Sequence, residues 1–272
     1  MTQTQAKAPA QEDATNIITG DRISIRFGGL MALSQVSFEM RAGSITAIIG
    51  PNGAGKTTLF NCITGFYRPT SGNIIYSNGE DEHSLNRMPI HKIARLGIAR
   101  TYQNIRLFGE MTALENLLVA QHQKVNHHLI SGIFKTSAFR RSESEATERA
   151  WFWLRFMGLE KDANMEAGNL PYGHQRRLEV ARAMATGPRL ICLDEPAAGL
   201  NEQETLGLND LITRLRDEHQ VSVLLIEHHM SVVMRISDHV VVLDHGEVIS
   251  AGTPANVQAD PKVIKAYLGE EE

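Results

Sequence analysis

Ile45-Thr-Ala-Ile-Ile-Gly-Pro-Asn-Gly-Ala-Gly-Lys-Thr-Thr58 is the stretch that decides the fold. Its first five residues, Ile45–Ile49, form a short apolar run, which is typical of a strand covered on both faces. The next residues have the spacing Gly-x4-Gly-Lys-Thr of a phosphate-binding loop, and a helical pattern continues to about Ile63. A strand, this loop and a helix in succession predict a P-loop domain that binds a nucleotide.

Each residue type in the loop has a physical role in this prediction. Gly50, Gly53 and Gly55 allow backbone N–H groups to surround an anion, and the start of the helix adds a favourable dipole. Lys56 is expected to reach the β- and γ-phosphates, and the hydroxyl of Thr57 is expected to ligate Mg²⁺. The other loop residues expected to bind the nucleotide are Pro51, Asn52, Ala54 and Thr58.

Two carboxylates follow a second apolar run, which is Leu190-Ile-Cys-Leu193. If this strand is parallel to the first, Asp194 and Glu195 lie at its carboxyl end, beside the phosphates. Asp194 is then expected to bind Mg²⁺, and Glu195 to act as the general base that polarises the attacking water. Without the P-loop, a solvated turn would be the better interpretation of this pair.

Two polar side chains become candidates only in this context. His228 follows the third apolar run, Val221–Ile226, where a further active-site side chain is expected, although His229 could compete for the role. Gln103 precedes an apolar segment, and its amide oxygen can ligate Mg²⁺ or hold a water molecule. Neither residue would be singled out alone.

Composition excludes several classes of protein. The chain has 272 residues, of which 42% are apolar and 21% charged, so a globular fold is expected and disorder is not. The 27 basic and 31 acidic residues give a net charge of −4, which argues against a nucleic-acid-binding surface. The longest apolar runs are too short to cross a bilayer, and the polar N-terminus has no signal-peptide pattern. Cys62 and Cys192 are expected to be buried, reduced thiols.

The alternation of strand and helix patterns predicts an α/β fold with a largely parallel core sheet. Residues 1–16 are expected to form a flexible tail, and 17–272 a single nucleotide-binding domain. Within this domain, a helical part of about 100–182 interrupts a strand-rich core that comprises 17–99 and 183–272.

Local patterns add detail to this outline. Residues 17–44 alternate as two antiparallel strands around a Gly-Gly turn, and Asn73–Tyr76 reads as a further strand. Residues 91–97 and 112–123 have helical patterns. Ser142-Glu-Ser-Glu145 has the spacing of a capping box, which predicts that a helix begins there.

The order of these motifs resembles that of ATP-binding cassette (ABC) nucleotide-binding subunits over about residues 20–269. The resemblance implies a P-loop NTPase of the ABC ATPase type, with an antiparallel β subdomain and a helical subdomain that faces membrane subunits. It implies that Phe27 is the aromatic A-loop residue that stacks on adenine, and that Gly50–Thr58 is the Walker A loop. Gln103 corresponds to the Q-loop glutamine.

The same resemblance covers the C-terminal motifs. Asp194 and Glu195 correspond to the Walker B pair, Ala197–Asn201 to the D-loop, and His228 to the switch histidine that contacts the γ-phosphate. The signature segment, usually Leu-Ser-Gly-Gly-Gln, reads Leu-Pro-Tyr-Gly-His over Leu170–His174 and keeps only Leu170 and Gly173. Both are expected to contact the nucleotide of a partner subunit.

Several longer segments show a closer resemblance. They are Arg26–Leu30, Arg100–Phe108, Glu115–Gln121, Asp194–Asn201, Ile226–Met230 and Ala266–Gly269. They resemble the larger ATPase subunits of bacterial high-affinity branched-chain amino acid importers. This implies an ATPase with ATP and Mg²⁺ as cofactors, which powers uptake of leucine, isoleucine and valine from the cytoplasmic face of the inner membrane. The implied partners are a second, different ATPase subunit, two transmembrane permease subunits and, indirectly, a periplasmic binding protein.

Three alternatives remain open at this point. A related ABC system could import urea or short amides, or export lipopolysaccharide. A soluble ABC ATPase that acts on nucleic acid or ribosomes usually has tandem cassettes or an inserted coiled coil, and neither pattern is visible here. An ATP-binding module without turnover would not need Lys56, Glu195 and His228 together.

Overall fold

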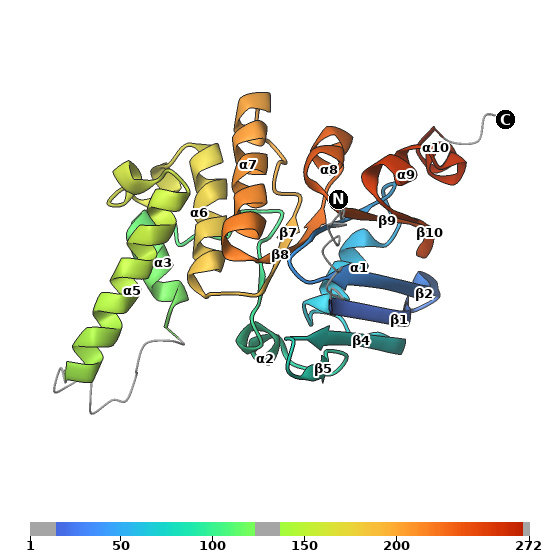
Figure 1. Cartoon of the computed structure of the whole chain (residues 1–272), viewed down its shortest axis with the longest axis horizontal. Helices are drawn as coiled ribbons and strands as arrows, with labels where there is room; N and C mark the ends of the chain where they lie inside the picture. Colours follow the sequence, from blue (N-terminus) through green and yellow to red (C-terminus); the bar gives the residue numbers. More distant parts are fainter. Residues whose placement is uncertain (1–14, 123–136, 269–272) are drawn as a thin grey trace, which may run out of the picture.

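The computed structural model describes residues 15–122 and 137–268. Most of the predicted tail, residues 1–14, lies outside this range, and the first strand begins at Asn16. Figure 1 shows that strands occupy the centre and one end of the molecule, whereas a group of helices forms the other end.

The larger sheet has six strands in the order β10-β9-β3-β8-β7-β6. Five of them are parallel, and β10 pairs antiparallel with β9 at one edge. The strands are β3 (Ile45–Ile49), β6 (Ile98–Arg100), β7 (Leu190–Asp194), β8 (Ser222–Ile226), β9 (His239–Asp244) and β10 (Glu247–Gly252). The predicted α/β fold with a largely parallel core sheet is confirmed.

The central strands β3, β7 and β8 are buried along their whole length, as their apolar runs predict. Alternate side chains of a strand point to opposite faces of the sheet. Ile45 and Ile49 join a core that includes side chains of α6, α7 and α8, whereas Ile48 joins a second core with α1. These helices are α1 (Lys56–Ile63), α6 (Tyr172–Ala185), α7 (Glu202–His219) and α8 (Met230–Ile236). Burial on both faces fixes the positions of the strand ends.

The smaller sheet is antiparallel, with the order β2-β1-β4-β5. Its strands are β1 (Asn16–Phe27), β2 (Leu30–Arg41), β4 (Ser71–Ser77) and β5 (Glu82–Ser84). Gly28 has a φ of 57° in the turn between β1 and β2, a conformation that glycine adopts readily. The predicted antiparallel pair and the predicted strand near residues 73–76 are therefore confirmed.

The helical end of the molecule contains α3 and α5, which pack against each other and against α6 (Figure 1). Helix α3 comprises Ala113–Ala120, and α5 comprises Ser137–Phe156. The other helices are α2 (Ile90–Arg95), α9 (Pro254–Gln258) and α10 (Pro261–Leu268), and 3₁₀ turns lie at Glu160–Asp162 and Ala167–Asn169. The predicted helical part is about 100–182; in the structure β6 ends at Arg100 and α6 ends at Ala185.

The predicted helix start at Ser142 is wrong, because α5 already begins at Ser137. No glycine or proline lies between these two residues to end a helix, so the Ser-x-x-Glu spacing falls in the helix interior. Capping boxes are instead found at Thr112 of α3 and at Asn201 of α7.

Cys62 and Cys192 are free and buried, as predicted. Burial raises the pKa of each thiol to about 12. No helix within residues 15–122 and 137–268 is both long and apolar enough to span a bilayer.

Candidate functional site

Four neighbouring parallel strands end at the same edge of the larger sheet. Strand β3 leads into the phosphate-binding loop, β8 leads to His228, β7 leads to Glu195, and β6 leads to Gln103. In the sheet, β8 lies between β3 and β7, and β6 lies beyond β7. Because the carboxyl ends of parallel strands share an edge, motifs that are far apart in the sequence meet there.

Glycine conformations shape the phosphate-binding loop. Gly50, Gly53 and Gly55 have φ values of 147°, 82° and 99°, in the region that other residues rarely adopt. A Cβ atom at Gly50 would collide with the carbonyl oxygen of Leu243 in β9, and one at Gly55 would lie 2.7 Å from the carbonyl oxygen of Ala32 in β2. The loop is therefore packed between the two sheets, and side chains do not fit at Gly50 or Gly55.

Lys56 lies within this loop and is buried. Its Nζ donates hydrogen bonds of 2.8 Å to the carbonyl oxygens of Gly50 and Pro51. Burial lowers the pKa of Lys56, and the carboxylate of Glu195 opposes this shift. An ammonium group held by the loop is suited to charge-assisted hydrogen bonds with phosphate oxygens.

Glu195 connects three of the strand ends. Its Oε2 accepts a 2.8 Å hydrogen bond from Nε2 of Gln103, and its Oε1 lies 2.6 Å from Nε2 of His228. The N–H of Glu195 donates to the carbonyl oxygen of Ile226 at the end of β8. Its φ of 47° is uncommon for a residue other than glycine, and such conformations cluster at functional sites. The structure thus brings Gln103, Glu195 and His228 together, as expected for a catalytic group.

Asp194 is buried at the end of β7 and pairs with Arg100, a residue that the motifs do not single out. Nη2 of Arg100 lies 3.0 Å from Oδ2 of Asp194, while Nη1 donates to Asn61 and Thr64 of the α1 region at 2.6 and 2.8 Å. Burial raises the pKa of Asp194, and the charge of Arg100 opposes this shift. Arg100 therefore links the Walker B strand to the helix that follows the phosphate-binding loop.

Replacing Arg100 by Met should destabilise the fold by about 3–5 kcal/mol, because it leaves the Asp194 carboxylate buried without its partner. Urea unfolding of the purified chain measures the change. Arg214→Met is the matched control, since Arg214 forms an exposed pair with Glu218, and its unfolding midpoint should stay nearly unchanged. Equal midpoints for both variants would contradict a structural role for the Arg100–Asp194 pair.

Glu227 is a further buried charge that no motif indicates. It is 1% exposed, and its Oε1 accepts the N–H of Ala197 at 2.9 Å. Its Oε2 accepts the N–H of His228 at 3.1 Å. Glu227 therefore holds the D-loop and the His228 segment together at the end of β8.

Phe27 lies at the tip of the β1–β2 hairpin, where it pairs with Leu30. The side chain is 43% exposed, and its ring packs edge-on against Tyr67, with 5.1 Å between the ring centroids. Because Gly55 packs against Ala32 of the same hairpin, the tip lies next to the phosphate-binding loop. This exposed ring is where the sequence predicts a base-stacking residue.

The signature segment forms the start of α6 and does not belong to the strand ends. Leu170 is buried, and Gly173 is packed so closely that a Cβ atom there would lie 2.6 Å from Oε1 of Glu204. Pro171 precedes the first residue of α6 and is exposed. Nδ1 of His174 lies 2.8 Å from Oδ2 of Asp162, so this nitrogen is engaged within the chain.

Comparisons with known proteins agree with this architecture. The family model described as "ABC transporter" matches residues 33–198, and the model described as "Branched-chain amino acid ATP-binding cassette transporter" matches residues 247–272. The chain is 56% identical to the high-affinity branched-chain amino acid transport ATP-binding protein BraF of Pseudomonas aeruginosa. That alignment covers 91% of this chain and 96% of BraF.

Solved structures of ATP-binding cassettes have the same fold. The ADP conformation of an ATP-binding cassette from an ABC transporter matches with a TM-score of 0.81 and 33% identity, over 94% of this chain and 100% of that one. A dimeric cassette in a post-hydrolysis state with ADP and Pi matches with a TM-score of 0.72 and 25% identity, over 87% and 98% of the two chains. The chain therefore belongs to the ABC transporter family, as an ATPase of the branched-chain amino acid transport type to which BraF belongs.

Proposed function

We propose that this chain hydrolyses ATP to power the uptake of leucine, isoleucine and valine across the bacterial inner membrane, and that it acts at the cytoplasmic face as a peripheral subunit. The observation that carries the proposal is the 56% identity with BraF over 91% of the chain. Import of urea or short amides, and export of lipopolysaccharide, are the alternative transport functions.

Uptake measurements in cells that lack the gene test this proposal. We expect the deletion to abolish uptake of radiolabelled leucine at low external concentration and to leave urea uptake unchanged. The wild-type gene should restore leucine uptake, whereas the Glu195→Gln variant should not. Normal leucine uptake in the deletion strain would contradict the proposal, and loss of urea uptake would favour the short-amide alternative.

We propose that a Mg²⁺ ion is held near the carboxyl ends of the strands and the start of α1, where it would neutralise charge on the β- and γ-phosphates. Its proposed ligands are the carboxylate of Asp194, the hydroxyl of Thr57 and the amide oxygen of Gln103. Carboxylate, hydroxyl and amide oxygens are hard donors of the kind that Mg²⁺ prefers. Thr57 is exposed in the first turn of α1, and the amide nitrogen of Gln103 donates to Glu195, which leaves the amide oxygen for a ligand.

Hydrolysis requires that a water molecule attack the γ-phosphorus while the bond to the oxygen of the leaving ADP breaks. We assign Glu195 as the base that accepts the proton of this water. His228, 2.6 Å from Glu195, is the proposed contact for the γ-phosphate, and Lys56 compensates charge on the β- and γ-phosphates. ADP and inorganic phosphate are the products.

The partner in the proposed complex is a second, different ATPase subunit. Each ATP would lie between the phosphate-binding loop of one subunit and the signature segment of the other. A related cassette forms a dimer in its post-hydrolysis state, which supports such pairing. In this arrangement Leu170 and Gly173 contact the nucleotide of the partner.

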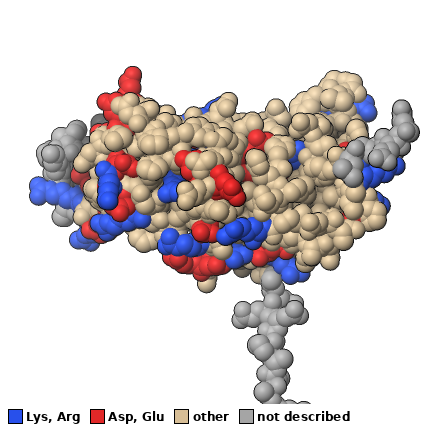
Figure 2. Space-filling model, turned by 90° about the horizontal axis from the view of Figure 1, so that it is seen from above, with Lys and Arg blue, Asp and Glu red and all other residues tan. Residues whose placement is uncertain are grey.

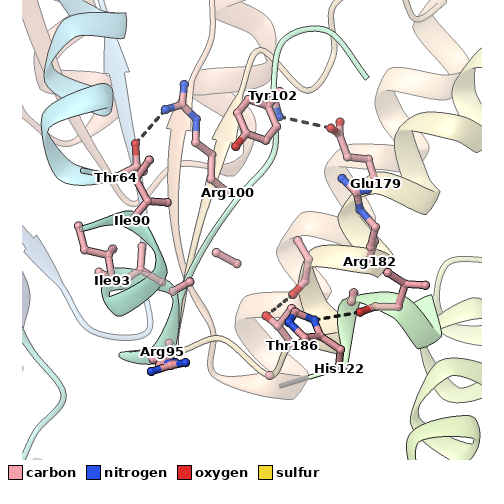
Figure 3. Close-up of a pocket in the computed structure, with 18 of the residues that line it drawn as sticks. Thr64, Ile90, Ile93, Arg95, Arg100, Tyr102, His122, Glu179, Arg182 and Thr186 are labelled. Carbon is pink, nitrogen blue, oxygen red and sulfur yellow. Dashed lines mark hydrogen bonds between the residues drawn. The ribbon is translucent and has the colours of Figure 1, made fainter. Parts of the chain in front are cut away.

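A groove of about 630 Å³ lies between α2 and β6 on one side and α3 and α6 on the other (Figure 3). Phe66, Ile90, Phe108 and Val119 line it, and each is exposed by 40% or more. Apolar surface that is left exposed in this way marks sites of protein–protein interaction. We propose that a transmembrane permease subunit docks here, with two such subunits in the complex and a periplasmic binding protein across the membrane.

Nucleic acid is not among the proposed partners. Figure 2 shows Lys and Arg interspersed with Asp and Glu on the face that it draws. Exposed ion pairs, such as Arg214 with Glu218, bring opposite charges together. A nucleic-acid-binding surface needs a continuous basic area, and the face drawn in Figure 2 does not show one.

Because the ring of Phe27 has no hydrogen-bonding group, the chain should bind GTP nearly as well as ATP. Stacking of a base on an aromatic ring contributes about 1–3 kcal/mol and hardly distinguishes adenine from guanine. Phe27→Ala should therefore weaken the binding of ATP and of GTP equally. Competition titrations against a fluorescent nucleotide can measure both affinities. A preference for ATP beyond about tenfold would show that polar groups recognise the adenine edge.

The two ATP sites of a heterodimer should turn over unequally. Pro171 replaces the signature serine, whose hydrogen bond to the γ-phosphate would contribute roughly 1.5–3 kcal/mol. ATP bound to the partner's phosphate-binding loop would face Pro171 of this chain. ATP bound to Lys56 would instead face the partner's own signature segment. Because Nδ1 of His174 is engaged by Asp162, that nitrogen does not replace the missing donor.

Walker B Glu→Gln variants, made in one subunit at a time, measure this inequality in the assembled complex. We expect the substitution at Glu195 to reduce ATP turnover more than the matching substitution in the partner. Pro171→Ser should raise turnover at the partner's site. A milder loss at Glu195 than in the partner would refute the inequality.

A further inference from the structure

Two buried charges on α6 have no part in the proposed chemistry. The side chains of Arg176 and Glu179 are each only 1% exposed, and Nη1 of Arg176 lies 3.2 Å from Oε2 of Glu179. A buried charge is costly unless it is both paired and hydrogen-bonded. Apart from the hydroxyl of Tyr172 on α6, which accepts from Nη2 of Arg176 at 3.3 Å, their other hydrogen-bond partners lie on the segment around Gln103, residues 102–106, which we call the Q-loop segment.

Arg176 and Glu179 both bind main-chain atoms of the Q-loop segment. Nη1 of Arg176 donates to the carbonyl oxygen of Tyr102 at 2.8 Å, and Nη2 donates to that of Gln103 at 2.7 Å. Oε1 of Glu179 accepts the N–H groups of Tyr102 and Arg106 at 3.4 and 3.3 Å. Figure 3 shows the first of these two contacts, from the Q-loop segment to α6.

Gln103 connects these contacts to the catalytic group. Its carbonyl oxygen is bound by Arg176, while its side chain donates to Glu195 at 2.8 Å. A shift of α6 would therefore move the amide of Gln103 relative to β7. Misplacement of a positioning group by about 1 Å can slow a reaction on the order of 100-fold.

We propose that Arg176 and Glu179 are positioning residues that fix the Q-loop segment to α6. The alignment of Gln103 with Glu195 then depends on the position of α6. The inference rests on the proposed role of Glu195 in hydrolysis. The helix α6 begins within the signature segment, and Glu179 lines the groove. A partner that binds at either place and shifts α6 would therefore also shift Gln103 relative to Glu195.

Arg176→Lys tests this inference in the full chain. Lysine keeps the positive charge next to Glu179, but it is shorter and lacks the planar guanidinium fork whose Nη1 and Nη2 donate separately to the carbonyl oxygens of Tyr102 and Gln103. We expect kcat for ATP to fall about tenfold with an unchanged KM. Hydrogen exchange at the amides of Tyr102 and Arg106, followed by mass spectrometry, should become about tenfold faster. If this variant does not fold, Glu179→Gln should produce both changes to a smaller extent.

Arg177→Lys is the matched control, because the guanidinium of Arg177 lies near Gly158 and Gly207. It should leave kcat, KM and amide exchange unchanged. In a Gln103→Ala background, Arg176→Lys should cause no further loss of kcat, because both substitutions act through one contact.

Two results would overturn the inference. The first is unchanged exchange at Tyr102 and Arg106 in the Arg176→Lys variant. The second is a further tenfold loss of kcat in the Gln103→Ala background. Full ATP turnover by Glu195→Gln would instead overturn the proposed role of Glu195, and amide exchange would still show whether α6 holds the Q-loop segment.

Discussion

Glu195→Gln is expected to lower kcat for ATP by at least about 10²–10⁴-fold, while ATP affinity stays nearly unchanged. The substitution removes the proposed base but keeps the size of the side chain. Its oxygen and nitrogen can still bond to Gln103 and His228, which lie 2.8 and 2.6 Å from the present carboxylate. The phosphate-binding loop is not changed at all.

Phosphate release and equilibrium nucleotide binding, measured on the same preparation, separate the two effects. Glu160→Gln is a suitable control, since it makes the same chemical change at an exposed position in a 3₁₀ turn of the helical part. It should hydrolyse ATP at the wild-type rate. Substantial turnover by Glu195→Gln would mean that another group activates the water.

Lys56→Ala should weaken ATP binding on the order of 100-fold. The ammonium group makes charge-assisted contacts, which contribute about 1.5–3 kcal/mol each when a phosphate accepts them. In the chain itself the group hydrogen-bonds the carbonyl oxygens of Gly50 and Pro51, so it is already held where a phosphate would bind. Alanine leaves the negative charge of the β- and γ-phosphates without this partner.

Titration with ATP and AMP measures the effect and identifies its source. AMP has neither of the two outer phosphates, so its affinity should be similar in Lys56→Ala and in the wild type. Lys161→Ala, an exposed substitution in the helical part, should bind ATP normally. An ATP affinity equal to that of the wild type would contradict the role of Lys56.

The central strands and the site residues at their ends could be predicted because each is a local pattern. Ile45–Ile49 is a short apolar run followed by the glycine-rich phosphate-binding loop, Leu190–Leu193 is one followed by two carboxylates, and both are buried strands in the structure. The strand order could not be predicted, because it depends on pairings between distant segments. The strand Ile98–Arg100 is only three residues long, which is too short to show a periodic pattern of apolar residues in the sequence.

The buried charges around the site could not be predicted for the same reason. Arg100 and Asp194 are 94 positions apart in the sequence, and Arg176 bonds to a carbonyl oxygen 74 positions away. A charged residue in a sequence is usually a solvated one, and only the fold shows that these are enclosed. Among these charged residues, Arg100 has the clearest local indication of burial, because it follows the apolar residues Ile98 and Ala99 and lies three positions before Gln103.

The two enclosed thiols, Cys62 and Cys192, have a practical consequence for experiments on this ATPase. A thiol with a pKa of about 12 is almost entirely protonated near neutral pH and reacts slowly with maleimides, and burial also denies the reagent access. A cysteine introduced at the surface, for example in place of Ser144 on α5, could therefore be labelled selectively in the wild-type background. Fluorescent reporters of movement in the helical part would need no prior removal of native cysteines.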